Sequence, residues 1–172
     1  MTIIAFKDGV MAADTMLSSH NSQNRAQKIV RLPDGGVAGG CGQWNRAYAG
    51  LKYLADGGDM DARGNTRAPE GPPNIEGATL LVAKADGSLW LIEDEFPAFP
   101  LRDSTASVGC GSDAALMAMT LGLSAVEAAT RVTKQDVLCG EPVQSMEVVP
   151  TAEYPAVVTH KRLPAKPKRK RK

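Results

Sequence analysis

The first two residues of the chain, Met1 and Thr2, offer its clearest chemistry. Removal of Met1 would leave a threonine that carries both a hydroxyl nucleophile and a free α-amino group. The pKa of an α-amino group is ordinarily about 7.7 to 8.0, so a useful fraction is neutral near pH 7 and accepts a proton. One residue would then supply the nucleophile and the base of covalent catalysis. A retained Met1 would leave an amide nitrogen without useful basicity.

The sequence after Thr2 predicts short strands that would hold this residue in place. The expected strands are residues 2–7, 10–14, 28–32 and 36–41. An Asp-Gly hairpin signal joins the first two strands, and Pro-Asp-Gly favours a turn between the last two. Thr2 and Asp14 therefore lie at strand ends, and Lys28 begins the third strand.

The rest of the chain alternates between helical and strand patterns. The expected helices are residues 45–56, a helix capped by Ser112 or Asp113 that ends at Gly122, and a helix from Ser124 to about Leu138. Further strands are expected at residues 78–84, 88–93, 105–109, 143–149 and 155–160. Ser124 and Glu127 have capping-box spacing, and residues 57–77 have the Gly and Pro content of a long loop. This order predicts an α+β fold of two packed sheets with helices outside them.

Length and charge predict one globular domain over residues 1–160, followed by a basic tail. The chain has 172 residues, of which 43% are hydrophobic, enough for a sizeable core. Residues 161–172 hold eight of the twenty Lys and Arg, which leaves twelve against nineteen Asp and Glu elsewhere. Such a tail should be disordered. The tail either binds nucleic acid or another polyanion weakly, or it is a solvated end that aids solubility.

Neither a membrane span nor a cysteine framework is indicated. No apolar run approaches the roughly eighteen residues that would cross a bilayer, and residues 2–6 are too short for a signal peptide, so a cytoplasmic protein is expected. Cys41, Cys110 and Cys139 are an odd number without a CxxC pair. Their spacing therefore suggests neither a disulfide framework nor a zinc site.

Five segments in order resemble the proteasome β subunit and its bacterial peptidase relatives. They are TIIAFKDGVMAAD, KIVRL, VAGGCG, GCGSDAA and DVLCG, and the resemblance extends from residue 2 to about residue 149. Those relatives are N-terminal nucleophile (Ntn) hydrolases with a four-layer αββα sandwich. The resemblance implies that fold here, and it implies a catalytic site that needs no metal or cofactor.

The resemblance assigns the nucleophile and its charged neighbours. Thr2 would attack a carbonyl through its hydroxyl, and its amine would accept the proton. Lys28 would favour the developing alkoxide and lower the pKa of the amine, because a nearby like charge disfavours protonation. Asp14 would pair with Lys28 and hold it charged. Taken singly, Lys28 could equally be a strand-edge lysine and Asp14 a strand-end cap.

The resemblance also assigns groups around the oxyanion and the amine. Gly42 aligns with the glycine whose N–H stabilises the oxyanion, although it could also be a turn glycine. Asp136 and Cys139 fit a D-x-x-S-G turn in which cysteine replaces serine, and Cys110 replaces a second supporting serine. Thiols are weak hydrogen-bonding groups, so these replacements weaken the surroundings of the amine. Both cysteines could instead be small buried apolar residues.

Substrate contacts are expected from four residues. Leu17 and Ser18 would offer backbone groups to an extended peptide by β-augmentation. Gly40 aligns with the floor of the primary pocket and implies depth there. Trp44 falls where relatives have a small residue, and it would either wall that pocket or pack under the first helix.

The leading hypothesis is therefore a threonine peptidase or amidohydrolase that acts on a peptide or protein substrate. By resemblance it would form a homo-oligomer, either a ring or a smaller assembly. A catalytically inactive proteasome-like scaffold is the alternative, favoured by the two cysteine replacements and by the dependence on Met1 removal.

Overall fold

The computed structural model describes residues 2–19, 22–61, 71–136 and 139–150. The strand expected at residues 155–160 and the basic tail lie outside these residues. The strands are Ile3–Lys7 (β1), Val10–Ala13 (β2), Met16–Ser19 (β3), Ser22–Arg25 (β4), Ile29–Arg31 (β5), Val37–Gly42 (β6), Ala78–Ala83 (β7), Leu89–Glu93 (β8), Glu95–Leu101 (β9), Ala106–Gly109 (β10) and Gln144–Glu147 (β11). The helices are Trp44–Ala55 (α1), Ser112–Thr120 (α2) and Ala125–Gln135 (α3).

Two antiparallel sheets form the centre of the molecule. One has the strand order β10-β1-β2-β11, and the other has the order β5-β6-β7-β8-β9. The β1–β2 hairpin turns through Asp8 and Gly9, which both have positive φ angles, as the Asp-Gly signal predicted. The register pairs Ile3 with Gly109, so β10 ends beside the start of β1.

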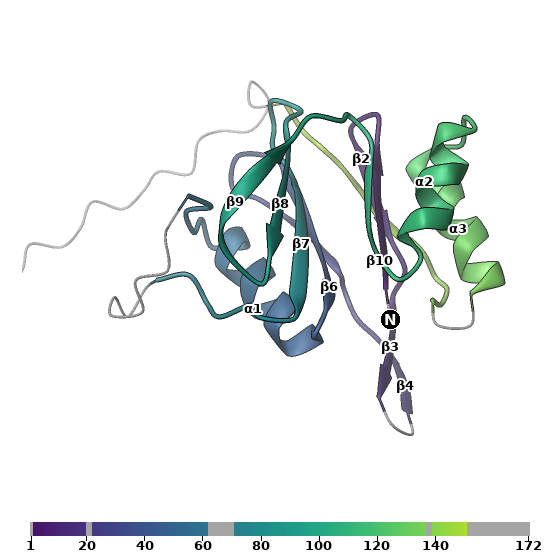
Figure 1. The fold of residues 1–172 in the computed structure, drawn as a ribbon, viewed down its shortest axis with the longest axis horizontal. Helices are drawn as coiled ribbons and strands as arrows, with labels where there is room; N and C mark the ends of the chain where they lie inside the picture. The colour runs from purple at the N-terminus through teal and green to yellow at the C-terminus, as the bar shows by residue number, and fades with distance from the viewer. Residues whose placement is uncertain (1, 20–21, 62–70, 137–138, 151–172) are drawn as a thin grey trace, which may run out of the picture.

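The sheets and helices stack in four layers (Figure 1). Successive residues of each strand point to opposite faces of the sheet. Each sheet is covered by helices on one face and by the other sheet on its second face, so residues on both faces are buried. On β1, Ile4 and Phe6 belong to the core between the sheets, while Ile3 and Ala5 face α2 and α3. On the other sheet, Leu80 and Val82 of β7 pack beneath α1. This arrangement confirms the predicted αββα sandwich.

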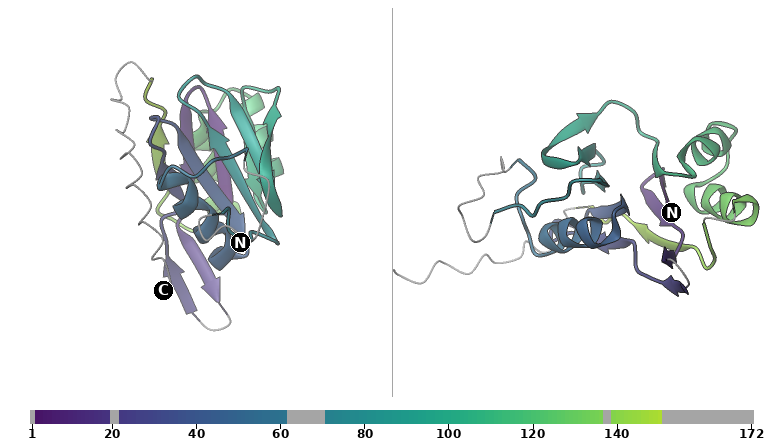
Figure 2. Two further views of the ribbon diagram at one scale, coloured as in Figure 1. Left: turned by 90° about the vertical axis from the view of Figure 1, so that its left-hand side faces the viewer. Right: turned by 60° about the horizontal axis from the view of Figure 1, so that its bottom comes forward.

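Three strands of the structure were not predicted, and each has a physical reason. The β3–β4 hairpin is largely polar (MLSS and SQNR), so it lacks hydrophobic alternation. It extends from the sandwich as a separate two-stranded sheet (Figure 2). The β9 segment EFPAFPL contains two prolines, which argue against a central strand. They are tolerated because β9 is the last strand of its sheet.

The helix signals were correct for α3 and partly wrong for α2. Ser124 and Glu127 form the predicted capping box, with the Ser124 side chain accepting from the Glu127 backbone N–H. The α2 N-cap is Gly111, without a side-chain cap bond, rather than Ser112 or Asp113. The third helix ends at Gln135, before the expected Leu138. Among the described residues, no helix is both long and apolar enough to cross a membrane.

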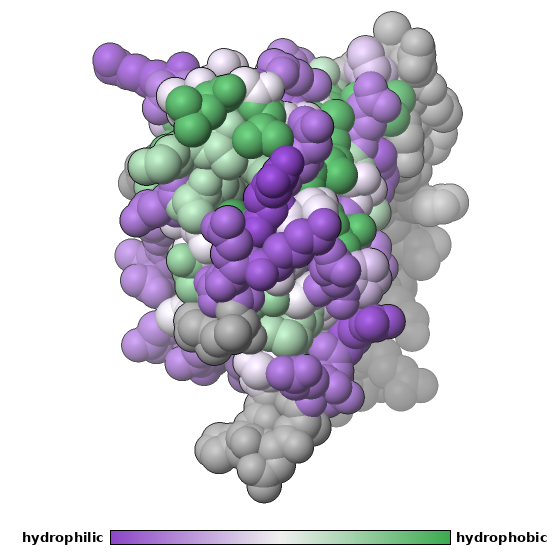
Figure 3. All heavy atoms as spheres, turned by 90° about the vertical axis from the view of Figure 1, so that its right-hand side faces the viewer, coloured by the Kyte–Doolittle hydropathy of each residue, from purple (hydrophilic) through white to green (hydrophobic). Residues whose placement is uncertain are grey.

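The side of the molecule that carries α2 and α3 exposes apolar groups among polar ones (Figure 3). Met117 and Leu121 are 67% and 78% exposed, and Leu116 and Val126 are also accessible. These residues contribute little to the core, because most of their area stays in water. The stability of the fold therefore resides in the three buried clusters between the layers.

A buried leucine and an exposed leucine provide a matched test of the layer arrangement. Leu81 is completely buried between the two sheets, and Leu121 is mostly exposed. We expect Leu81→Ala to lower the free energy of unfolding by about 2–5 kcal/mol, because it removes buried methyl groups and leaves a cavity. Leu121→Ala should change it by less than about 0.5 kcal/mol. Urea denaturation of both variants measures this difference, and equal effects would contradict the layer assignment.

Candidate active site

Asp14 and Lys28 form a completely buried ion pair at the end of the sandwich where the chain begins. The Lys28 Nζ atom lies 2.9 Å from Asp14 Oδ1 and 3.0 Å from Oδ2. Both side chains have zero exposure. Asp14 directly follows β2 and Lys28 directly precedes β5, so each comes from the sheet that holds its strand. The predicted pairing of these two residues is confirmed.

The Lys28 ammonium also reaches the hydroxyl of Thr2. It donates a hydrogen bond to Thr2 Oγ1 at 2.8 Å and another to the carbonyl oxygen of Met16 at 2.6 Å. Thr2 itself is only 5% exposed. The ammonium is therefore held between a carboxylate, a carbonyl and the candidate nucleophile, where its charge would act on Thr2 Oγ1 with little screening by water.

The Asp14 carboxylate accepts hydrogen bonds from backbone N–H groups of three segments. Ile3 N donates to Oδ1 at 3.0 Å, while Met16 N and Gly140 N donate to Oδ2 at 3.1 and 3.3 Å. These bonds satisfy a buried charge that would otherwise be costly. They also fix the backbone beside Thr2, because Ile3 is the next residue along the chain.

Sequence reasoning missed Gln144 of β11, whose side chain forms hydrogen bonds with the backbone around Asp14 and Lys28. Its side-chain amide donates to the carbonyl oxygens of Asp14 and Ala26 at 3.0 and 3.2 Å. Its Oε1 atom accepts from Lys28 N at 3.2 Å. The signal in the sequence is weak, since one glutamine at a strand start is ordinary. The carbonyl of Met16 was likewise unpredictable, because its position depends on the unpredicted hairpin.

Gly42 ends β6 next to this cluster. Gly40 N donates to the carbonyl oxygen of Lys28 at 3.0 Å, so the Gly40 N–H points toward β5. Because N–H directions alternate along a strand, the N–H of Gly42 faces the same edge, one step beyond Lys28. Gly42 has a φ of 88°, and a Cβ atom there would collide with the carbonyl oxygen of Gly77. Glycine is therefore required by the turn, which is compatible with an oxyanion role.

Cys110, Asp136 and Cys139 meet close to the main chain of Thr2. Cys110 Sγ lies 3.4 Å from the carbonyl oxygen of Thr2 and 3.7 Å from Cys139 Sγ. Asp136 Oδ2 lies 4.0 Å from Cys110 Sγ and 3.8 Å from Cys139 Sγ. Cys139 is buried, whereas Cys110 is exposed. The reading of both as buried apolar residues therefore fails for Cys110, which sits in the turn before α2.

Burial raises the pKa of two thiols. The pKa of Cys139 lies well above its usual range, chiefly because burial disfavours the thiolate and secondarily because of Cys110 and Asp14. Burial, with a further contribution from Cys110, raises the pKa of Cys41 to about 11. Neither Cys41 nor Cys139 is therefore a ready nucleophile at neutral pH.

The candidate substrate residues occupy two different environments. Leu17 and Ser18 lie on β3 and pair with Asn24 and Gln23 of β4. Among the described residues β3 pairs with one strand, β4, so the opposite edge of β3 is the one that β-augmentation would use. Whether a peptide binds there stays a prediction.

Gly40 and Trp44 both face the core beneath α1. A Cβ atom at Gly40 would lie 3.0–3.2 Å from side-chain atoms of Leu80, Ala47 and Leu51. A side chain at position 40 would therefore be crowded by the core beneath α1, and the role of Gly40 as a pocket floor stays a prediction. Trp44 is partly buried against the same core, and its ring centroid lies 6.2 Å from that of Tyr48. Packing under the first helix thus describes Trp44, while its role toward substrate stays a prediction.

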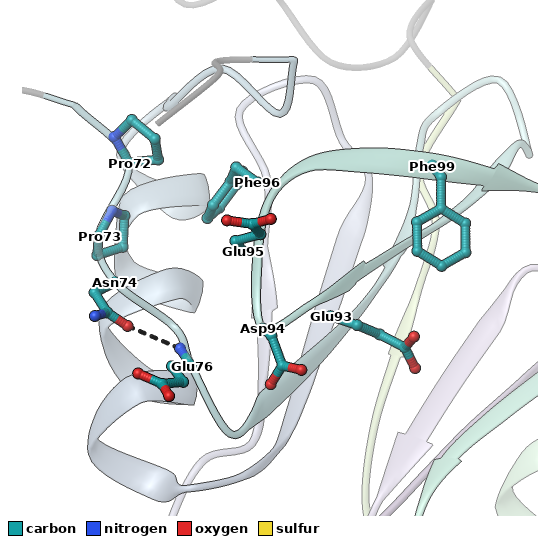
Figure 4. A pocket seen from close by; sticks show the side chains of 9 residues that line it. All are labelled: Pro72, Pro73, Asn74, Glu76, Glu93, Asp94, Glu95, Phe96 and Phe99. Atoms are coloured by element: carbon teal, nitrogen blue, oxygen red, sulfur yellow. Dashed lines mark hydrogen bonds between the residues drawn. The ribbon is translucent and has the colours of Figure 1, made fainter. Parts of the chain in front are cut away.

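A separate pocket of about 620 Å³ opens between the loop before β7 and the β8–β9 turn (Figure 4). Glu76, Glu93, Asp94 and Glu95 give it an acidic lining, with Phe96 and Phe99 as apolar walls. None of the predicted site residues is among those that line it. Its lining is therefore distinct from the residues of the Thr2 cluster.

Solved structures with the same fold belong to proteasome-like proteins. BPH of Thiobacillus denitrificans, solved alone and in complex with epoxomicin, superimposes with a TM-score of 0.59 at 20% identity. These comparisons cover 87% of this chain and 98–99% of BPH. HslV from Trypanosoma brucei gives a TM-score of 0.57 at 19% identity, covering 86% of this chain and 99% of HslV.

The comparisons define the class of fold. BPH and HslV are proteasome-family Ntn hydrolases, so the chain has the αββα sandwich of that class, as its sequence resemblance implied. No protein-family model matches the chain, and no curated protein matches it. At 19–20% identity the structural likeness establishes the fold alone.

Removal of the buried cation tests the geometry of this site. We expect Lys28→Met to lower the free energy of unfolding by about 3–5 kcal/mol, because the Asp14 carboxylate would stay buried without its partner. The control is Lys52→Met, which removes an exposed partner of Asp56 on α1 and should leave the denaturation midpoint unchanged. Urea denaturation of both variants provides the measurement. A Lys28→Met variant as stable as the Lys52→Met control would contradict the buried pair.

Proposed function

We propose that the protein is a proteasome-like N-terminal threonine peptidase or amidohydrolase that forms an acyl-enzyme after removal of Met1. The observation that carries this proposal is the 2.8 Å hydrogen bond from Lys28 Nζ to Thr2 Oγ1, made by an ammonium whose charge Asp14 balances at zero exposure. A hydroxyl beside a fixed, desolvated cation is suited to become an alkoxide.

The nucleophilic step would use both functional groups of Thr2. Thr2 Oγ1 attacks the amide carbonyl carbon, and its proton passes to the α-amino group of the same residue. The Lys28 ammonium stabilises the negative charge that develops on Oγ1. Asp14 acts as a positioning residue, since its bonds to Ile3 N and Lys28 Nζ fix both partners around the nucleophile.

The tetrahedral intermediate would be stabilised and resolved by neighbouring groups. The N–H of Gly42 would hold the oxyanion, a contribution that is typically worth about 10²- to 10³-fold in rate. The protonated amine then donates to the leaving nitrogen, and the C–N bond breaks. Water then attacks the resulting ester, its C–O bond to Thr2 breaks, and the acyl group leaves as a carboxylic acid while the Thr2 hydroxyl is regenerated. No step in this sequence uses a metal or cofactor.

A peptide or protein is the proposed substrate class. The free edge of β3, which carries Leu17 and Ser18, is suited to pair with an extended chain through main-chain hydrogen bonds. The BPH structure in complex with epoxomicin supports this class by analogy of fold, since that protein binds the compound.

The inactive scaffold is the second candidate, and the two thiols favour it. Cys110 and Cys139 surround the start of the chain where relatives carry hydroxyl groups, and thiols donate weak hydrogen bonds. The buried pair favours the enzyme instead. Ion pairs of this kind can often be replaced by hydrophobic residues without loss of stability, so a scaffold has no need of one.

Mass spectrometry and labelling distinguish these two functions. We expect purified protein to begin at Thr2, and a peptide that carries an electrophile directed at N-terminal threonine to add to that residue. Thr2→Ala should abolish the label, while Thr2→Ser should retain it because hydroxyl and amine are both preserved. Deletion of residues 161–172 provides the matched control and should not alter labelling. Absence of label on protein that has lost Met1 would reject the peptidase and support the scaffold.

Assembly is a separate consequence of the proposal. We expect the full chain to form a homo-oligomer, and size-exclusion chromatography with light scattering measures its mass. Met117→Glu and Leu121→Glu place charges on the exposed apolar groups of α2 and test whether this helix contributes to the contact. A monomer at micromolar concentration would contradict the assembly without bearing on the Thr2 chemistry.

A further inference from the structure

The Cys110, Asp136 and Cys139 side chains form a cluster that the proposed hydrolysis does not use as a unit. Their ligand atoms all lie within 4.8 Å of one another. The cysteines are separated by 29 residues and lack the CxxC spacing of familiar zinc sites, so their spacing alone does not indicate a metal site. The fold brings them together where the β10–α2 turn meets the end of α3.

The distances within this cluster match those around a tetrahedral zinc ion. With Zn–S bonds of about 2.3 Å, two thiolates of a tetrahedral site lie about 3.8 Å apart. The observed separation of Cys110 Sγ from Cys139 Sγ is 3.7 Å. A carboxylate oxygen at about 2.1 Å from zinc would lie about 3.6 Å from each sulfur. Asp136 Oδ2 lies 3.8 Å and 4.0 Å from the two sulfurs.

The chemistry and accessibility of the three groups also fit a soft divalent cation. Two sulfur ligands favour zinc over magnesium or calcium, which prefer oxygen. Cys110 is exposed, Asp136 is partly exposed and Cys139 is buried. A cation could therefore reach the cluster from solvent on the Cys110 side, while Cys139 is held within the core.

We propose that Cys110, Asp136 and Cys139 form a binding site for a zinc-class divalent cation beside the main chain of Thr2. Three protein ligands leave the fourth position to water, the arrangement of reactive rather than structural zinc sites. Binding releases the thiol protons to solvent. The hydrogen-bonded turn from Cys139 N to the carbonyl oxygen of Asp136, at 3.1 Å, fixes the spacing of two of the ligands.

The proposed site and the proposed nucleophile are neighbours. Cys110 Sγ contacts the carbonyl oxygen of Thr2 at 3.4 Å, so a cation held by this cluster would lie beside the main chain of Thr2. Binding of the cation and labelling of Thr2 are nevertheless tested by separate measurements.

Cobalt and zinc titrations of the full chain test the site without reference to activity. The protein is stripped with a chelator and kept in a non-thiol reductant. We expect one equivalent of Co²⁺ to give thiolate-to-cobalt charge-transfer absorption and the intense visible bands of tetrahedral Co²⁺, both removed by Zn²⁺. Competition with a chromophoric chelator then gives the zinc affinity.

Substitutions assign the signal to the cluster. Cys110→Ser and Cys139→Ser should each diminish the charge-transfer band and weaken zinc binding at least about tenfold, and Asp136→Asn should weaken binding while keeping the band. Cys41→Ala is the matched control, since Cys41 lies outside the cluster, and it should bind as the unaltered chain does. Circular dichroism checks folding; Cys110→Ser, at an exposed position, keeps the test valid if Cys139→Ser does not fold.

Three outcomes would overturn the proposal. They are the absence of a stoichiometric cobalt spectrum, zinc affinity unchanged in both cysteine variants, and a Cys110–Cys139 disulfide that persists in the reductant. Failure of Thr2 to label under any condition would reject the hydrolase and leave the metal result standing.

Discussion

The interaction on which this end of the molecule depends is the buried pair of Asp14 and Lys28. Each charge would cost several kcal/mol to bury alone, so neither residue can occupy its place without the other. Their hydrogen bonds reach Thr2, Ile3 and Met16, which ties the start of β1 to the end of β2 and the start of β5. The pair thereby couples the correct stacking of the two sheets to the position of one hydroxyl group.

The close approach of the sheets depends on small residues near this pair. A Cβ atom at Gly39 would lie 2.6 Å from Ile4 Cγ2 and 2.9 Å from Met11 Sδ, so the side chains of one sheet occupy the space that Gly39 leaves on the other. At Gly109, a Cβ atom would collide with the carbonyl oxygen of Thr2. Packing and chemistry are therefore set by the same constraint, because larger side chains here would displace the residues that hold the site.

The parts of the structure that could be predicted from sequence are those with local signals. The Asp-Gly hairpin, the capping box of Ser124 and Glu127 and the strand starting after Lys28 depend on neighbouring residues, and all are present. The β3–β4 hairpin has no hydrophobic alternation, and the prolines of β9 concealed an edge strand. The filled space beside Gly40 was equally unpredictable, because the leucines that fill it come from β7 and α1.

The candidate site combines predictable and unpredictable contacts in the same way. Resemblance to known hydrolases groups Thr2 with Asp14 and Lys28, and it also places Cys110, Asp136 and Cys139 near the amine, because its motifs carry their order. The contacts of Gln144 and the 3.7 Å approach of the two sulfurs have no such motif. They depend on β11 pairing with β2, on β10 pairing with β1, and on α3 packing against β1 and β2. Long-range pairing of this kind is decided by the whole core rather than by local sequence.

The surroundings of Thr2 therefore combine two sets of groups that differ in chemical character. At its hydroxyl, an ammonium paired with a carboxylate is held by backbone groups at zero exposure, which would suit the stabilisation of an alkoxide. Near its carbonyl oxygen lie two thiols and a second carboxylate, where the resemblance leads us to expect hydroxyl groups. The two sets are connected, because Gly140 N, which follows Cys139, donates to Asp14 Oδ2. A change at Cys139 would therefore affect the Asp14–Lys28 pair through the Gly140 backbone.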